Sequence, residues 1–270
     1  MPFKDNICIE LSRPEYVPVL KDGTIYYGGC QMWFSDHRRY SKDYILHNYG
    51  CGTIATADLF LYLALHRKSF QTEITALAIN KENKINHSDY IAYLRHINTE
   101  YTKTRPYLAV LGPAAAYAIN SYSKDYGLGL KASWKWCLTY FDMYHLIEEM
   151  LRKDIPVILS IGPNTPKLWG RKGIPFYVLK EIDYLEPREN TEENSEEISK
   201  PYYYHAVHQN VCGHYVTVTA LIKDEITDRI MLRISSWGKQ YYINYEEYWD
   251  YIENIGGTFT SSMIEIKEIN

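Results

Sequence analysis

Two residues far apart in the sequence have the types needed for nucleophilic catalysis. Cys51 lies between Gly50 and Gly52 and opens a run with helical periodicity. A thiol at a helix N-terminus feels the positive end of the helix dipole, which is expected to lower its pKa and favour the thiolate. His214 follows Gly213 at the start of an alternating segment and could carry the proton for that nucleophile. A cysteine that opens a helix early, followed by a histidine that opens a strand much later, is the order expected of a cysteine peptidase.

A third motif follows the histidine. Ser235-Ser236-Trp237-Gly238 closes the segment expected to pair with the His214 strand, so it should lie near that imidazole. A serine there could orient the ring, and the indole could shield their hydrogen bond from water. Each motif alone is weak evidence, because an inert buried cysteine or a surface histidine would look the same.

These residues need elements that hold them in place. Apolar residues recur at helical spacing in four segments, which are 51–68, 86–98, 113–122 and 141–153. The first of these is expected to be an amphipathic helix that carries Cys51 at its start. Apolar or alternating runs then predict strands at 155–161, 176–182, 214–222, 229–237 and 258–269.

Helices followed by strands predict an α+β fold, in which an N-terminal helical lobe packs on a C-terminal antiparallel sheet. We expect a single domain over 1–270, with a helix-rich lobe over about 1–153 and a β-rich lobe over about 154–270. Residues 186–201 are acidic and almost free of apolar side chains, so we expect a mobile insertion there.

The three motifs resemble those of the papain-like cysteine peptidase superfamily, most closely its bacterial branch of bacteriocin-processing, double-glycine-peptidase-like enzymes. They read G-C-G at Cys51, G-H-Y-V-T-V-T at His214 and S-S-W-G at the strand end. The likeness runs in order from about Asn48 to Trp249 and is strong only in the motifs. It implies a papain-like fold, a peptide or protein substrate, and no metal or organic cofactor. It also implies that the Cys51 thiolate attacks an amide carbonyl while His214 acts as general base and then acid. We expect Gly50, Gly213 and Trp237 to line the substrate cleft.

The sequence departs from the papain pattern at two positions. The asparagine that orients the histidine is replaced by Ser235, and Ser236 could serve instead, depending on which strand face points at the cleft. The glutamine expected about six residues before the cysteine is Ile45. Asn48 or His47 could then donate to the oxyanion together with the Cys51 backbone N–H.

Three other functions stay open. One is a zinc site, because His205, His208, Cys212 and His214 are ligand types, although their spacing matches no tight zinc knuckle. Another is acyl transfer to an amine, as in transglutaminase-like and arylamine acetyltransferase-like proteins, whose third residue is usually an aspartate that this chain does not clearly supply. The last is an inactive binding module that uses the tyrosines at 202–204 and the acidic insertion.

Composition limits the other function classes. The net charge is -4 and no basic stripe is present, which argues against nucleic-acid and membrane-surface partners. The N-terminus has no apolar signal-peptide core, and no apolar run is long enough to span a bilayer. Five widely spaced cysteines are no disulfide framework, so we expect a reducing, cytoplasmic setting, with signal-independent export left open. No motif indicates the oligomeric state.

Overall fold

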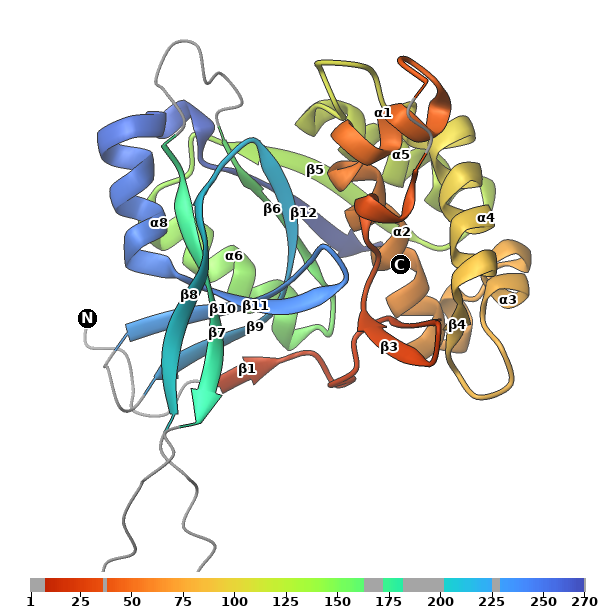
Figure 1. Ribbon diagram of the computed structural model, residues 1–270, viewed down its shortest axis with the longest axis horizontal. Helices are drawn as coiled ribbons and strands as arrows, with labels where there is room; N and C mark the ends of the chain where they lie inside the picture. The colour runs from red at the N-terminus through yellow and green to blue at the C-terminus, as the bar shows by residue number, and fades with distance from the viewer. Residues whose placement is uncertain (1–7, 36–37, 163–171, 182–201, 225–228, 270) are drawn as a thin grey trace, which may run out of the picture.

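The computed structural model describes residues 8–35, 38–162, 172–181, 202–224 and 229–269. A twisted antiparallel sheet and a cluster of helices lie side by side in an α+β arrangement (Figure 1). Within the described ranges, every helix is too short or too polar to cross a lipid bilayer. The expected insertion at 186–201 lies outside the described residues.

The main sheet is antiparallel throughout its described pairings, as predicted. Its strand order is β5-β12-β6-β9-β10-β11-β7-β8, and β1 pairs with the far end of β9. The strands are β1 (Cys8–Glu10), β5 (Leu130–Trp136), β6 (Val157–Ile161), β7 (Ile174–Glu181), β8 (Tyr202–Val211), β9 (His214–Asp224), β10 (Arg229–Ser236), β11 (Lys239–Asn244) and β12 (Ser262–Glu268).

Seven α-helices occur among the described residues: α1 (Lys42–Tyr49), α2 (Cys51–His66), α3 (Glu73–Ala78), α4 (His87–Ile97), α5 (Gly112–Asp125), α6 (Tyr140–Arg152) and α8 (Tyr245–Tyr251). A small sheet of β2 (Pro18–Lys21), β3 (Thr24–Tyr27) and β4 (Ile85–Asn86) lies among the first helices. The 3₁₀ turn η1 (Gln31–Trp33) follows β3 in the chain. The four helices predicted from apolar periodicity are all present, and so is α8, whose start the sequence marks with the capping-box pattern of Asn244 and Glu247. Helices α1 and α3 were not predicted.

Helix α2 is buried around its whole circumference. Thirteen of its sixteen residues are buried, because the helix runs between the other helices and strand β9. The prediction of an amphipathic helix is therefore wrong. A helix with no solvent-facing side needs apolar or small residues on every face, and the 59–65 run supplies them.

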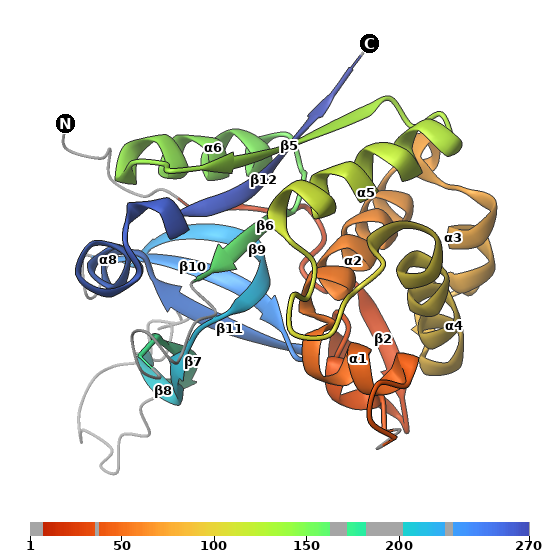
Figure 2. The same ribbon diagram turned by 90° about the horizontal axis from the view of Figure 1, so that it is seen from above.

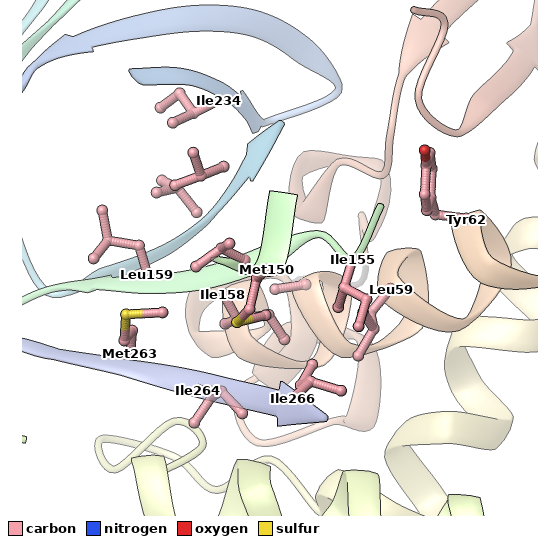
Figure 3. Packing of buried hydrophobic residues seen from close by; sticks show 14 of the residues in the cluster. Leu59, Tyr62, Met150, Ile155, Ile158, Leu159, Ile234, Met263, Ile264 and Ile266 are labelled. Atoms are coloured by element: carbon pink, nitrogen blue, oxygen red, sulfur yellow. The ribbon is translucent and has the colours of Figure 1, made fainter. Parts of the chain in front are cut away.

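The sheet includes or contacts two elements that precede the predicted division of the lobes at about residue 153. Strand β5 pairs with β12 along its whole length, and α6 packs on β9 and β12, so both belong with the sheet (Figure 2). The apolar stripe of α6 explains this position, because its buried residues Ile147, Met150 and Leu151 need an apolar partner surface. Met150 belongs to the same buried cluster as Ile158 and Met263 of the sheet, and Figure 3 labels these side chains.

Candidate active site

Cys51 lies at the junction of two helices that meet the sheet. Helix α1 ends where the Gly50 N–H bonds to the Leu46 carbonyl at 2.9 Å, and α2 begins at the next residue. A β-carbon added to Gly52 would lie 3.1 Å from the Val110 side chain and 3.2 Å from the Tyr215 ring. The glycine therefore lets the helix that carries the cysteine approach the strand that carries the histidine.

The electrostatic surroundings of Cys51 differ from the sequence expectation. The residue is 8% exposed, and this burial raises the pKa of the thiol. Backbone hydrogen bonds from Tyr215, Gly52 and Cys51 itself lower the pKa, but they do not outweigh the loss of solvation. The expected low pKa is thus wrong for the free protein, because a helix N-terminus stabilises a thiolate less than water does at a site so deeply enclosed.

His214 opens β9 and borders the same two cavities as Cys51. Its Nε2 lies 2.8 Å from the Ser236 hydroxyl, and its ring stacks on Trp237 with centroids 4.7 Å apart and planes at 23°. Burial lowers the pKa of His214 to about 4, so the imidazole is neutral at neutral pH. With Nε2 engaged by the serine, Nδ1 is the ring nitrogen left for a second partner.

The two serines of the third motif, Ser235 and Ser236, have different hydrogen-bond partners. Ser236 contacts the histidine, whereas the Ser235 hydroxyl donates to the Tyr27 carbonyl at 2.7 Å. Neighbouring strand residues point to opposite faces, and an irregularity between Arg233 and Ile234 resets the register of β10 on β9. The serine at the asparagine position therefore does not contact the imidazole, and its neighbour does.

Trp237 is held over the imidazole by a strained turn. Trp237 and Gly238 form the two-residue connection between β10 and β11, with φ angles of 48° and 73°. Such a turn requires positive φ at both positions, which favours glycine and costs energy for tryptophan. Strain of this kind is typical of functional positions. The predicted cleft residues Gly213 and Trp237 both border the outer cavity, which measures about 380 Å³, while Gly50 is buried at the helix junction.

A glutamine that the sequence analysis did not consider lies in the cleft. Gln31 borders both cavities with Cys51, and its Nε2 donates to the His47 carbonyl at 2.9 Å. Its Oε1 is buried without a hydrogen-bond partner among the described residues. Asn48 also borders the outer cavity, but it is exposed and its Nδ2 donates to the Tyr44 carbonyl. The ring of His47 contacts the Phe34 carbonyl through Nδ1.

Gln31 was missed because its spacing is unusual. It lies twenty residues before Cys51 (51 − 31 = 20), instead of the six expected from the resemblance. The signal in the sequence was a single amide side chain in the segment Gly28-Gly29-Cys30-Gln31, where paired glycines permit close backbone approach.

The considered zinc ligands are not brought together. Within the ranges that the structure describes, no three His, Cys, Asp or Glu side chains gather so that they could hold a metal ion. His208 instead lies beside Trp237 and contacts the Tyr241 hydroxyl at 3.3 Å.

The chain was compared with known proteins in three ways. No protein-family model matches it, and neither the search of curated proteins nor the search of solved structures gave a match.

Proposed function

We propose that this protein is a cysteine-dependent amide hydrolase of papain-like type, with Cys51 as nucleophile and His214 as general base and acid. The observation that carries the proposal is the shared cleft: a cysteine at a helix N-terminus and a histidine bonded through Nε2 to Ser236 border the same inner cavity. Helix α2, which carries Cys51, contacts strand β9, which carries His214. This contact between a helix and the sheet supports the proposal, because the resemblance implies it.

The neutral state of both groups suits a mechanism in which the proton moves as the bond forms. The Cys51 thiol gives its proton to Nδ1 of His214 while sulfur attacks the amide carbonyl. The imidazolium then protonates the leaving amine, and the acyl group stays on sulfur as a thioester. A water molecule, deprotonated by the neutral His214, attacks the thioester and releases the acid and the thiol.

The remaining residues support this chemistry. Cys51 and Gln31 both border the inner cavity. The donors proposed for the developing oxyanion are the Cys51 backbone N–H and the second N–H of the Gln31 amide, since the first donates to the His47 carbonyl. Ser236 fixes the orientation of the imidazole, and the stacked Trp237 shields their hydrogen bond from solvent. The outer cavity extends from Cys51 along residues 208–213, where an extended peptide would bind.

The test measures the reactivity of the thiol and then its product. Wild type, His214→Ala and Cys51→Ala are treated with iodoacetamide from about pH 4 to 9, and the modified cysteine is located by mass spectrometry. We expect selective, His214-dependent modification of Cys51. Incubation with a complex peptide mixture should then produce new N-termini in wild type and none in Cys51→Ala. Products that carry an added amine would instead indicate acyl transfer, and an unreactive Cys51 would reject the enzyme and favour a binding module.

A further inference from the structure

We propose that Asp58 is a positioning residue of this active site, whose ionised carboxylate holds the Gly28-Gly29 segment and so sets the place of Gln31 beside Cys51. The proposal rests on the function proposed above. Asp58 lies seven residues after Cys51 on α2, which is about two turns along the same helix face. Its side chain borders the inner cavity with Cys51 and His214 and is 1% exposed.

Two donors from different parts of the chain converge on the carboxylate. The Tyr90 hydroxyl of α4 donates to Oδ1 at 2.6 Å, and the Gly29 N–H donates to Oδ2 at 2.9 Å. Acidic side chains are rarely so deeply buried unless several hydrogen bonds stabilise them. A buried acid on the helix that carries the nucleophile is thus bonded to the backbone of the segment that leads to Gln31.

The segment is held tightly on its other side as well. A β-carbon added to Gly28 would lie 2.6 Å from Asp58 Oδ2 and 2.5 Å from Ser235 Oγ, so the backbone passes between α2 and β10 with no spare room. Ser235 donates to the Tyr27 carbonyl, and Gly28 N–H bonds to the Val17 carbonyl. Gln31 follows two residues after Gly29 and starts η1, so a shift of Gly29 carries the glutamine with it.

The charge of Asp58 decides how many of these bonds can form. An ionised carboxylate accepts from both Tyr90 and Gly29, whereas a protonated carboxyl uses one oxygen as a donor and gives up part of that capacity. Burial raises the pKa of Asp58 to about 7, opposed by the hydrogen bonds from Tyr90 and Gly29. Burial also raises the pKa of each tyrosine and thiol around it, and His214 is neutral, so these neighbours carry no charge at pH 7. They are Tyr16, Tyr90 and Tyr93, which interact with Asp58, and Cys51, His214 and Tyr215, which border the same cavity. Asp58 is therefore the group of this set that changes charge near pH 7.

The experiment follows the segment and the thiol separately. In protein labelled with ¹⁵N, the Gly29 amide and the Gln31 side-chain amide are recorded from pH 5 to 9, and Cys51 alkylation by iodoacetamide is timed over the same range. In wild type we expect both amides to shift with a common midpoint near 7. In Asp58→Asn, which has the shape of the acid but cannot ionise, both shifts should disappear and the alkylation rate at pH 8 should fall roughly fivefold.

Tyr90→Phe gives a second test that does not depend on the fold tolerating a change at Asp58. It removes a donor that favours the ionised carboxylate, so the common midpoint should move to higher pH. If the Gly29 midpoint moves and the Gln31 amide does not follow it, Asp58 does not set the position of Gln31 and its role is purely structural. If Gln31 and Cys51 keep their wild-type behaviour in Asp58→Asn, the positioning role is rejected. If Cys51 is alkylated equally in wild type and in His214→Ala, the proposed function is rejected instead. The two amide shifts would still report on Asp58.

Discussion

An imidazole lies beside a serine hydroxyl at each end of helix α2, and the two pairs have different surroundings. At the N-terminal end, His214 contacts Ser236 and borders the inner cavity that Cys51 also borders. At the C-terminal end, His66 Nδ1 lies 3.1 Å from Ser12 Oγ, and its Nε2 lies 2.7 Å from Asp154 Oδ2 at a solvent-accessible surface. The second cluster has the residue types of a serine hydrolase, and the first does not.

Hydrogen bonding explains why residue types alone mislead. The Ser12 hydroxyl donates to Asp154 at 2.9 Å, and its N–H donates to the other carboxylate oxygen at 2.8 Å. The carboxylate thus competes for the proton that a nucleophilic serine must give to histidine. Tyr62 of α2 donates to the same carboxylate, so this cluster ties the N-terminal segment, α2 and the turn after α6 together. The cluster of Ser12, His66 and Asp154 is therefore a structural clasp. At the other end of α2, the side-chain hydrogen bond of His214 engages Nε2, and the proposed mechanism uses Nδ1.

The largest effect should separate the two histidines. His214→Ala removes the proposed base, so the rate of Cys51-dependent amide hydrolysis should fall by roughly 10²- to 10⁴-fold. The matched variant His66→Ala changes the other end of the same helix and should leave that rate within about twofold, because it touches nothing in the cleft. The measurement is hydrolysis of a peptide identified in the mixture assay. Equal losses in both variants would contradict the comparison.

A second contrast concerns stability against pH. Burial lowers the pKa of His214 from 6.5 to about 4. Its contribution to the free energy of unfolding is therefore fully present above pH 6.5 and is lost as pH falls toward 4. The pKa of Asp58 is raised from 3.8 to about 7, so stability is lost as pH rises between those values. At about 1.4 kcal/mol per pKa unit, the change amounts to at most roughly 3 kcal/mol for His214 and roughly 4 kcal/mol for Asp58.

These opposite slopes can be separated by urea unfolding between pH 4 and 8. Relative to wild type, His214→Ala should gain stability toward acid pH, whereas Asp58→Asn should gain stability toward neutral pH. Two variants with the same slope as wild type would show that neither group changes its protonation between the folded and unfolded states.

A smaller effect should distinguish the two serines of the third motif. Ser236→Ala removes the partner of His214 Nε2, and the loss of one hydrogen bond should slow hydrolysis severalfold, roughly five- to tenfold. Ser235→Ala is the matched control because its hydroxyl bonds to the Tyr27 carbonyl, so it should affect stability more than the orientation of the imidazole. A larger fall in kcat for Ser235→Ala than for Ser236→Ala would reverse this assignment.

The smallest effect is expected at the clasp. Ser12→Ala removes hydrogen bonds to Asp154 and His66 and should lower the free energy of unfolding by about 0.5–1.5 kcal/mol. Alkylation of Cys51 should remain at the wild-type rate. A variant that keeps full stability but loses Cys51 reactivity would show that the clasp acts on the active site and not on the fold.

Much of the architecture could be predicted from local patterns. The predicted helix starts and the alternating strands were found within a few residues, because apolar periodicity reports which face is buried. The α+β class and the antiparallel hairpin of β9 and β10 followed from the same signal. Two features could not be predicted, namely the burial of α2 on every side and the placement of β5 and α6 with the sheet. Both depend on which surfaces meet in the folded chain.

The sequence by itself determined that Cys51 opens a helix, that His214 opens a strand and that a serine pair ends the next strand. These are local properties, set by glycines and by periodicity. Only the tertiary structure decided that Ser236 and not Ser235 contacts the histidine, because a register irregularity in the sheet selects the face. It also brought Gln31 and Asp58 to the cleft, and it raised the pKa of the Cys51 thiol, because burial depends on segments distant in the sequence.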